Sequence, residues 1–365
     1  MQCAALKNIF AVTTAGFSPT GDPSIAFIQL TAEKRKPWFN FHLELNRLFR
    51  APFSLLNKFQ FYLSGSKLSF PEKDYKELSK HSFDLIICHH PASLDLAFKL
   101  KSKYNCKLIF NAHEIYSLEF EDDPQWMKNN FNIIDGLLRK YLPQCDRVFS
   151  VNQEICDFYI EQYKCKCVPV HNSKPYHPVK AGQVYLPMRV IHHGGAMPQR
   201  KLEQMADAVL SLPDKYALTF MLVNTNNRYL SELKAKYEPL GIKFIDTVPY
   251  SEIIHAINSY DIGLYILPQG NINQQLALPN KLFEFLQAKL AIICSPNKAM
   301  KNLVTTNKIG AVAEGFETSD MIKLLKSLTP EQVYSYKKRC EEVASELSSA
   351  SDEERILNTV SSLLN

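Results

Sequence analysis

Short apolar runs alternate along this chain with longer segments in which apolar residues recur every three or four positions. Short runs of this kind are typical of buried strands in a parallel sheet, and the longer segments are typical of amphipathic crossover helices. We therefore expect two series of strands, on either side of a proline-rich segment at 172–187. The strands are expected at 9–13, 25–30, 83–88, 106–111, 147–151 and 167–170, then at 189–193, 218–223, 243–246, 262–266, 290–294 and 311–313.

This alternation predicts an α/β chain with two Rossmann-like, doubly wound domains. Residues 1–180 are expected to form the N-terminal domain, residues 181–350 the C-terminal domain, and residues 351–365 a closing helix. Residues 1–7 look like the end of a helix that leads directly into a strand, so the first strand of the N-terminal domain could be missing, shortened or replaced. Further helices are expected at 93–102, 153–162, 202–210, 251–259 and 280–287.

The composition is that of an ordinary globular protein, with 46% hydrophobic and 22% charged residues. No apolar run reaches the roughly 18 residues of a membrane-spanning helix, and the N-terminus has no secretory pattern. The nine cysteines are odd in number and several lie inside apolar runs, which is typical of reduced thiols. Because Cys165 and Cys167 are the only close pair in the sequence, we expect no metal site. The lack of a membrane span and of a secretory pattern predicts a cytoplasmic location.

Positive charge is concentrated in residues 34–67, where seven Lys or Arg accompany one acid, Glu44. The net charge of the chain is +5, so the rest of it is close to neutral and a nucleic-acid partner is not expected. Aromatic residues are interleaved with the basic ones, a pattern that suits an anionic membrane surface. The alternative is a pair of packed helices whose aromatic side chains face the core.

The predicted strand at 189–193 ends in Gly194 and Gly195, and the loop that follows carries Arg200 and Lys201. Glycines let a backbone approach a ligand closely, and the two basic side chains can neutralise phosphate charge. The segment is not Gly-x-Gly-x-x-Gly, which counts against a nicotinamide or flavin cofactor. The alternative is an ordinary turn between a strand and a helix with exposed basic residues.

A polar loop precedes residues 278–285, and an apolar run follows them, which predicts a helix that begins at Asn280. The free N–H groups and partial positive charge of a helix start suit a phosphate. Glu284 would lie about one turn further, where its carboxylate can accept hydrogen bonds from the two hydroxyls of a ribose. The alternative is an ordinary capped helix with Glu284 on a solvated face. Ligand contacts are therefore expected at Leu278, Pro279, Asn280, Lys281 and Glu284.

Two other loops follow predicted strands at the edge where open α/β sheets bind ligands. The loop with Pro249 could hold a nucleobase through backbone groups, although Ser251 also reads as a helix cap. His113 follows an apolar strand and could contact substrate hydroxyls or share a proton, the alternative being a structural histidine bonded to a nearby loop. His89 and His90, at the end of another strand, are weaker candidates for the same cleft.

The chain resembles retaining glycosyltransferases of family 4 and their relatives, mainly between residues 189 and 325. The resemblance implies a GT-B fold, in which two Rossmann-like domains face each other across a cleft. It places a nucleotide-sugar donor on the C-terminal domain and an acceptor on the N-terminal one, with the closing helix crossing back to the first domain. The residues that carry it are Gly194-Gly195 with Arg200 and Lys201, Asp261-Ile262-Gly263-Leu264, and Leu278-Pro279-Asn280-Lys281 with Glu284.

The same resemblance implies a role for each matched residue. Glu284 would bind the ribose, and the backbone of 277–280 the sugar and phosphates. Arg200 and Lys201 would stabilise the departing diphosphate without a bound metal, and His113 would contact a sugar hydroxyl. The chain departs from the family at two positions, because Leu276 stands where a second Glu is common and Ala196 where an Arg is common.

The resulting expectation is a glycosyltransferase that moves a sugar from a nucleoside diphosphate sugar to a glycan or lipid-linked acceptor. Retention of configuration, a role in bacterial surface polysaccharide synthesis and a place at the inner face of the membrane are part of this expectation. One alternative is a nucleotide-sugar 2-epimerase with the same two-domain layout, which would need no acceptor. Another is a non-catalytic binding or scaffold protein that keeps the fold.

Overall fold

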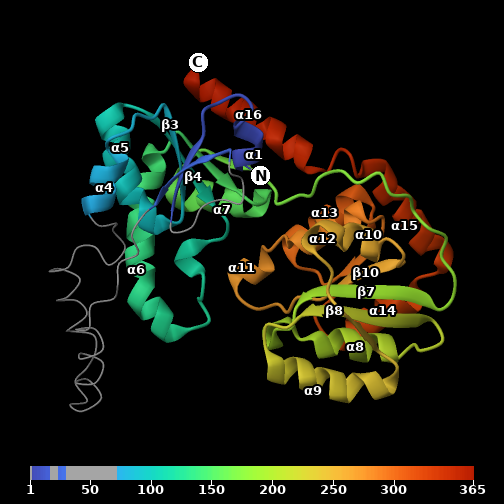
Figure 1. Cartoon of the computed structure of the whole chain (residues 1–365). Helices are drawn as coiled ribbons and strands as arrows, with labels where there is room; N and C mark the ends of the chain where they lie inside the picture. The colour runs from blue at the N-terminus through green and yellow to red at the C-terminus, as the bar shows by residue number, and fades with distance from the viewer. Residues whose placement is uncertain (1, 17–23, 30–71) are drawn as a thin grey trace, which may run out of the picture. The chain divides into compact units, whose positions relative to one another are not determined.

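The computed structural model describes residues 2–16, 24–29 and 72–365. The basic segment 34–67 therefore lies outside the described residues. The chain divides into two compact units (Figure 1), which are considered separately. The N-terminal unit comprises 2–150, 156–168 and 356–365, and the C-terminal unit comprises 151–155 and 169–355.

The N-terminal unit contains a four-stranded sheet in the order β3-β4-β5-β6, in which β4 pairs with β3 and β5 in parallel. Its central strand β4 is an apolar run whose side chains Leu108, Ile109 and Phe110 are fully buried. The strands are β3 (Leu85–His89), β4 (Lys107–Ala112), β5 (Arg147–Ser150) and β6 (Cys167–Pro169). The accompanying helices are α4 (Glu72–Leu78), α5 (Leu94–Tyr104), α6 (Pro124–Tyr141) and α7 (Gln153–Tyr163).

The start of the chain differs from the predicted strand pattern. Helix α1 (Gln2–Leu6) precedes β1 (Thr13–Gly16), so the strand expected at 9–13 begins only where that range ends. Among the described residues, β1 pairs in parallel with β2 (Ala26–Gln29) in a separate two-stranded sheet. The polar residues Thr13 and Thr14 form part of this strand, and an apolar run alone does not locate such a strand.

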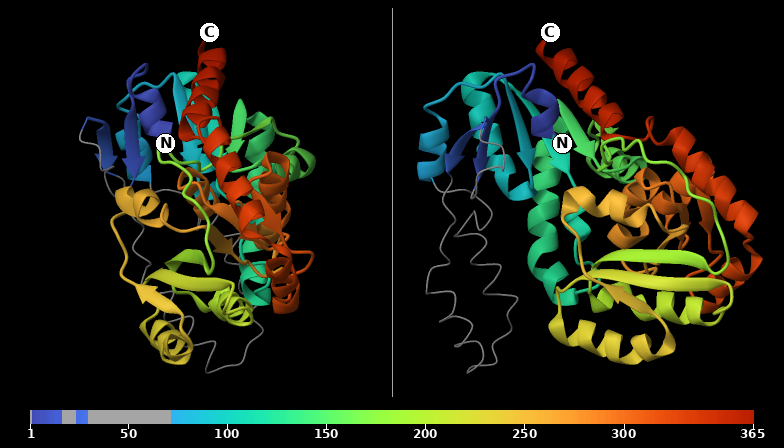
Figure 2. Two further views of the ribbon diagram at one scale, coloured as in Figure 1. Left: turned by 90° about the vertical axis from the view of Figure 1, so that its right-hand side faces the viewer. Right: turned by 45° about the vertical axis from the view of Figure 1, so that its right-hand side comes forward.

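The C-terminal unit contains a six-stranded parallel sheet in the order β12-β11-β10-β7-β8-β9. Its strand order reverses between β7 and β10, as in a dinucleotide-binding fold, and ligands bind beyond the carboxyl ends of the strands at such a switch point. The first strand in sequence, β7, lies in the middle of the sheet beside β8 (Figure 2). The strands are β7 (Met188–Gly195), β8 (Tyr216–Val223), β9 (Lys243–Ile245), β10 (Ile262–Tyr265), β11 (Ala291–Cys294) and β12 (Gly310–Val312).

Alternate residues of these strands feed two buried cores, one on each face of the sheet. Val190 and Leu264 join one core and Ile191 and Tyr265 the other, as expected for neighbouring side chains that point to opposite faces. The first core is covered by α8 (Leu202–Leu210), α9 (Asn227–Tyr237) and α14 (Thr318–Ser327). The second is covered by α10 (Ile253–Ile257), α12 (Asn280–Gln287), α13 (Lys298–Asn307) and α15 (Pro330–Val343).

Asp261, which precedes β10, is fully buried and has a structural role. Its carboxylate lies 3.1 Å from Nζ of the fully buried Lys337 and accepts a hydrogen bond of 2.9 Å from the backbone N–H of Arg189. The buried charge is thus paired and hydrogen-bonded, and it ties the start of β7 to β10 and to α15. No helix among the described residues has the length and apolar character needed to cross a lipid bilayer.

Candidate functional site

The side chain of Lys281, at the start of α12, lies against the backbone of Gly194, near the end of β7. Gly194 has a φ of 134°, and a Cβ atom placed on it would lie 2.2 Å from Cε of Lys281. Only a residue without a side chain fits this close approach, because any Cβ would displace the lysine. Helix α12 has Pro279 as its N-cap residue, with no hydrogen bond from a capping side chain. The helix start therefore offers backbone N–H groups beside the lysine.

Glu284 is 5% exposed and lies on α12 with two partners from other segments. Its Oε1 lies 3.0 Å from Nζ of Lys174, and its Oε2 lies 3.3 Å from Nε2 of His193 at the end of β7. The second approach lacks hydrogen-bond geometry, and within the described part of the chain Nε2 of His193 has no other hydrogen-bond partner. The carboxylate is thus turned into the protein, and the reading of Glu284 on a solvated face is wrong.

His193 stays neutral beside this carboxylate. Burial, together with the nearby charges of Lys281 and Lys174, lowers its pKa to about 3. A neutral imidazole carries a single N–H group. When that hydrogen is on Nε2, His193 can donate a hydrogen bond to Glu284 or to a ligand. Together with Lys174, Arg200, Lys281 and Glu284, His193 forms what we call the charged cluster.

Lys174 is held in place by the start of α16 (Ser349–Leu364). Its backbone carbonyl accepts a hydrogen bond of 2.8 Å from the N–H of Ser349, and the neighbouring Ser173 donates to the buried carboxylate of Asp352. Its side chain is 8% exposed, and Nζ donates to the hydroxyl of Tyr250. Sequence reasoning missed this residue, because Lys174 lies in the proline-rich segment 172–187, which served only to separate the two series of strands.

Among the described residues, no carboxylate forms an ion pair with Arg200 or Lys281, the other cations of the charged cluster. The guanidinium of Arg200 donates to the hydroxyl of Tyr265 at 2.6 Å. Lys281 lies over the same ring, with Nζ 5.9 Å from its centroid, and burial lowers its pKa together with the nearby charge of Arg200. Three cations share one carboxylate here, so the cluster carries an excess of positive charge that favours an anion.

The remaining predicted residues of the C-terminal unit lie in the segments that carry this cluster or next to them. Lys201 has a left-handed backbone (φ 45°) as the N-cap of α8 and is exposed. Pro249 is also exposed and precedes Tyr250, which contacts Lys174. The structure thus brings Gly194, Lys281, Glu284 and Arg200 into one neighbourhood, with Gly195, Leu278, Pro279 and Asn280 in the same two segments.

Leu276 occupies the position at which the family often carries a second Glu, and its backbone carbonyl is hydrogen-bonded. Its carbonyl accepts a hydrogen bond of 2.7 Å from Nδ2 of Asn152, a buried residue of the same unit. The side chain of the neighbouring Gln275 donates to the carbonyl of Gly270 at 3.1 Å. The loop before α12 is thereby fixed through backbone groups.

In the N-terminal unit, His113 belongs to a second polar group, which we call the histidine cluster. Nδ2 of Asn111 lies 3.1 Å from Nδ1 of His89 and 3.2 Å from Nε2 of His113. Burial and the neighbouring His113 lower the pKa of His89 to about 4, and burial lowers the pKa of His113. His90 is not part of this cluster, because its Nδ1 accepts the N–H of Ala92 in a helix cap.

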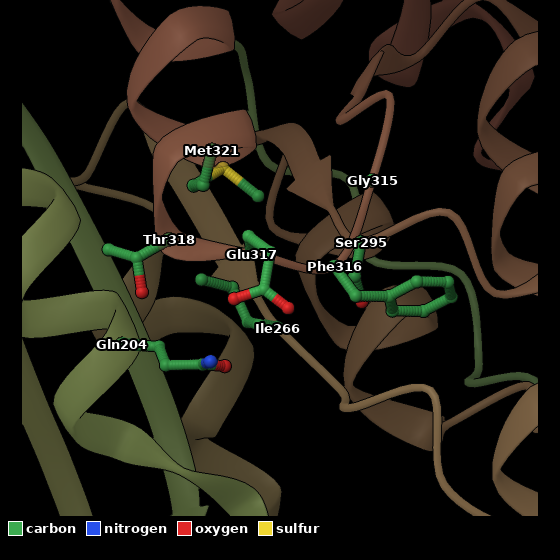
Figure 3. A pocket seen from close by; sticks show the side chains of 8 residues that line it. All are labelled: Gln204, Ile266, Ser295, Gly315, Phe316, Glu317, Thr318 and Met321. Carbon is green, nitrogen blue, oxygen red and sulfur yellow. The ribbon is translucent and has the colours of Figure 1, made fainter.

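A narrow hollow lined by Gln204, Ile266, Ser295, Gly315, Phe316, Glu317, Thr318 and Met321 lies beside the start of α14 (Figure 3). None of the predicted site residues lines it. Its acidic residue, Glu317, is explained by helix capping, because Glu317 and Asp320 form a reciprocal capping box. The hollow therefore does not mark the ligand site. Within the described residues, no group of three His, Cys, Asp or Glu side chains is placed to hold a metal ion.

Comparison with known proteins gives a family match and a set of similar folds. Residues 30–173 match the profile of Glycosyltransferase Family 4, whereas the comparison with curated proteins gives no match. Anabaena HepE in complex with UDP-glucose is 14% identical, with 96% of this chain and 92% of that chain covered and a TM-score of 0.66. Sucrose-phosphate synthase from Thermosynechococcus elongatus is 12% identical (99% and 91% covered, TM-score 0.67), and a glycosyltransferase from Rickettsia africae is 13% identical (100% and 93% covered, TM-score 0.69).

Two Rossmann-like units built on parallel sheets, and similar to these structures over most of the chain, define a GT-B fold. The family match and the fold together confirm the predicted class of enzyme, a GT-B glycosyltransferase that resembles family 4. The matched profile covers the N-terminal region, whereas the motifs that carried the resemblance in sequence lie mainly between 189 and 325.

Proposed function

We propose that the C-terminal unit binds a nucleoside diphosphate sugar and that the enzyme transfers the sugar to a glycan or lipid-linked acceptor. The observation that carries this proposal is the charged cluster at the switch point of the sheet. One buried carboxylate, Glu284, stands there beside three cations and the start of α12. A diphosphate would balance the positive excess, and a ribose would offer the carboxylate two hydroxyl donors.

Each part of the donor has a candidate partner. Glu284 accepts hydrogen bonds from the ribose hydroxyls, and Pro249 contributes backbone groups to the base. Lys281 and the backbone of Gly194 and Gly195 bind the diphosphate. The backbone from Leu278 to Asn280 lies along the sugar and phosphates, and no resident metal or cofactor is needed. Arg200 and Lys201 stabilise the negative charge that develops on the departing diphosphate.

His113 in the N-terminal unit donates a hydrogen bond to a hydroxyl of the transferred sugar, and the anomeric configuration is retained. The structures of HepE and of TarM from S. aureus contain UDP, so UDP-sugars are the first donors to test. Synthesis of a bacterial surface polysaccharide at the inner face of the membrane remains our proposal for the acceptor side. Segment 34–67 would hold the enzyme there, which binding to anionic vesicles that weakens with salt would support.

Two other functions fit the same fold. A nucleotide-sugar 2-epimerase would convert the donor to an isomer without any acceptor, so product analysis distinguishes it. A non-catalytic binding protein is suggested by Leu276 and Ala196, the two departures from the family pattern. Tight donor binding without turnover of any nucleotide sugar, with or without acceptor extract, would favour that reading.

The decisive experiment removes the carboxylate at the centre of the charged cluster. Glu284→Ala should weaken UDP binding by about 2–3 kcal/mol, because charge-assisted hydrogen bonds to the ribose are lost. Isothermal titration measures this change, and circular dichroism verifies that the variant is folded. The matched control is Glu341→Ala, which removes a partly buried carboxylate that pairs with Lys338 on α15. Equal UDP affinity of folded Glu284→Ala and the wild type would rule out the proposed donor site.

A further inference from the structure

The side chains of the histidine cluster come from the ends of two adjacent strands of the N-terminal sheet. Strands β3 and β4 pair in parallel with His89 directly beside Asn111, and His113 follows Asn111 by two residues. His113 is the first residue after β4, and the contacts of Asn111 with both rings bring all three side chains together at the carboxyl end of the sheet. The two imidazole rings stack with centroids 5.7 Å apart and planes inclined by 15°. Asn111 is 7% exposed, so its amide is enclosed by the pair.

The amide nitrogen of Asn111 carries two hydrogens, and two ring nitrogens lie within hydrogen-bond distance of it. These are Nδ1 of His89 at 3.1 Å and Nε2 of His113 at 3.2 Å, and the two ring nitrogens are 3.5 Å apart. A ring nitrogen that accepts a hydrogen bond must be unprotonated, so its ring carries the hydrogen on the other nitrogen. Both contacts can form together only if the two histidines adopt opposite tautomers.

We propose that Asn111 is a positioning residue that donates to both rings and so fixes His89 with its hydrogen on Nε2 and His113 with its hydrogen on Nδ1. His113 is then a neutral hydrogen-bond donor through Nδ1, oriented by an amide that itself contacts no substrate. Hydroxyl oxygens of a sugar accept such a hydrogen bond. This inference rests on the proposed function of His113, and it adds the device that sets the protonation of that residue.

The surroundings of the rings agree with a neutral pair. Burial lowers the pKa of both histidines, and the neighbouring His113 lowers that of His89 further, to about 4 in all. An Asn between them accepts no proton and adds no charge, unlike the carboxylate that commonly orients a histidine. Isolated imidazole side chains favour the Nε2–H tautomer, so a dominant Nδ1–H form of His113 would indicate that its surroundings select this tautomer.

The test is the tautomeric state of each histidine in the full chain without substrate. Long-range ¹H–¹⁵N spectra of ¹⁵N-histidine-labelled protein at neutral pH distinguish the tautomers, and His89→Gln and His113→Gln assign the signals. We expect Nδ1–H for His113 and Nε2–H for His89. The exposed His81 of the same unit serves as an internal reference. An Nε2–H tautomer for His113 would mean that the amide of Asn111 is turned round, and it would overturn the proposal.

Substitution of Asn111 separates positioning from packing. Asn111→Asp keeps the shape but replaces the donor by an acceptor, so both tautomers should reverse, with His89 protonated on Nδ1 and His113 on Nε2. Asn111→Leu removes the donor, and His113 should return to the Nε2–H form. The control Asn129→Asp adds the same charge at an exposed site of α6 and should leave both rings unchanged. Unchanged tautomers in a folded Asn111→Asp variant would show that Asn111 only fills space.

Kinetics add a readout that depends on the proposed function. For a donor that the wild type turns over, Asn111→Asp should lower kcat about tenfold to a hundredfold with little change in KM for the nucleotide sugar, the order seen for a misplaced catalytic group. A fall in nucleotide affinity without a fall in kcat would contradict a role beside the sugar. If no donor is turned over, the proposed function fails, whereas the tautomer measurement still decides the role of Asn111.

Discussion

The charged cluster of the C-terminal unit and the histidine cluster of the N-terminal unit are both polar groups at the carboxyl ends of parallel strands, but they differ in charge. The charged cluster combines the cations Lys174, Arg200 and Lys281 with the single carboxylate of Glu284. The histidine cluster contains no full charge, because its two rings have lowered pKa values and its third member is an amide.

This difference matches the two halves of a sugar nucleotide. A diphosphate is an anion and is held by charge, which acts over several ångströms and tolerates some displacement. A sugar hydroxyl is neutral and is held by hydrogen bonds, which need a defined donor at a defined angle. Under the proposed function, the buried lysines would serve the first task, and His113, oriented by the amide of Asn111, would serve the second.

The largest expected effect comes from breaking the buried pair of Lys174 and Glu284. Lys174→Met leaves the carboxylate buried without its cation, and the free energy of unfolding should fall by about 3–5 kcal/mol, the range for such pairs. Chemical denaturation measures the change. Lys180→Met is the matched control. This lysine belongs to the same segment, its Nζ lies 3.8 Å from Oε1 of Glu341, and its side chain is 88% exposed, so its loss should change stability little.

A double-mutant cycle sharpens the result. Lys174→Met and Glu284→Gln together should be less destabilising than the sum of the single changes. Each single change leaves one buried charge without its partner, whereas the double variant removes both charges of the pair. Strictly additive losses would mean that the two side chains do not interact in solution, and the charged cluster would then lose its central contact.

A smaller loss of free energy is expected from a change at Lys281, whose side chain lies against Gly194. No carboxylate of the described residues forms an ion pair with it. Lys281→Gln should weaken UDP binding by about 1.5–3 kcal/mol, the range for hydrogen bonds to charged groups, while uridine binding stays nearly the same. Titration with the two ligands separates the phosphate contribution from that of the nucleoside. Should uridine and UDP lose affinity equally, Lys281 would act on the shape of the site rather than on phosphate charge. Lys201→Gln, at an exposed cap, should have the smaller effect of the two.

Much of the C-terminal unit could be predicted because its signals are local. The apolar runs at 189–193, 218–223 and 262–266 fall on β7, β8 and β10. The helix start at Asn280 coincides with the first residue of α12. Buried parallel strands and the loops at their carboxyl ends leave such a record in the sequence, and the proximity of Gly194 to Glu284 follows from the strand order.

The partners of the predicted residues could not be found in this way. Lys174 and Glu284 are 110 positions apart in the chain, and their contact depends on a backbone hydrogen bond from Ser349 that no periodicity encodes. Asn111 stood inside the segment that was singled out for His113, but its importance depends on the pairing register of β3 with β4. Strand register is a property of the assembled sheet, whereas periodicity in the sequence reports only which face a residue takes.

The last prediction compares the histidines of the two clusters through pH and has the smallest expected effect. His193 has a pKa of about 3 in the folded chain, well below its ordinary value of 6.5. Between these values the unfolded chain binds a proton that the folded chain does not, so the free energy of unfolding falls as the pH falls, by about 1.4 kcal/mol per pH unit for this one group. Above the ordinary value its contribution is constant.

His193→Gln should therefore reduce the acid slope of stability by that amount between about pH 5 and 6, measured by denaturation across the range. His81→Gln, an exposed site, should leave the slope in place. The slope that His89 adds should persist in His193→Gln, since its pKa is lowered to about 4 in the other unit. Identical slopes for His193→Gln and the wild type would mean that His193 takes up a proton in the folded chain. Glu284 would then be paired with two cations, and the histidines of the two units would no longer share a neutral state.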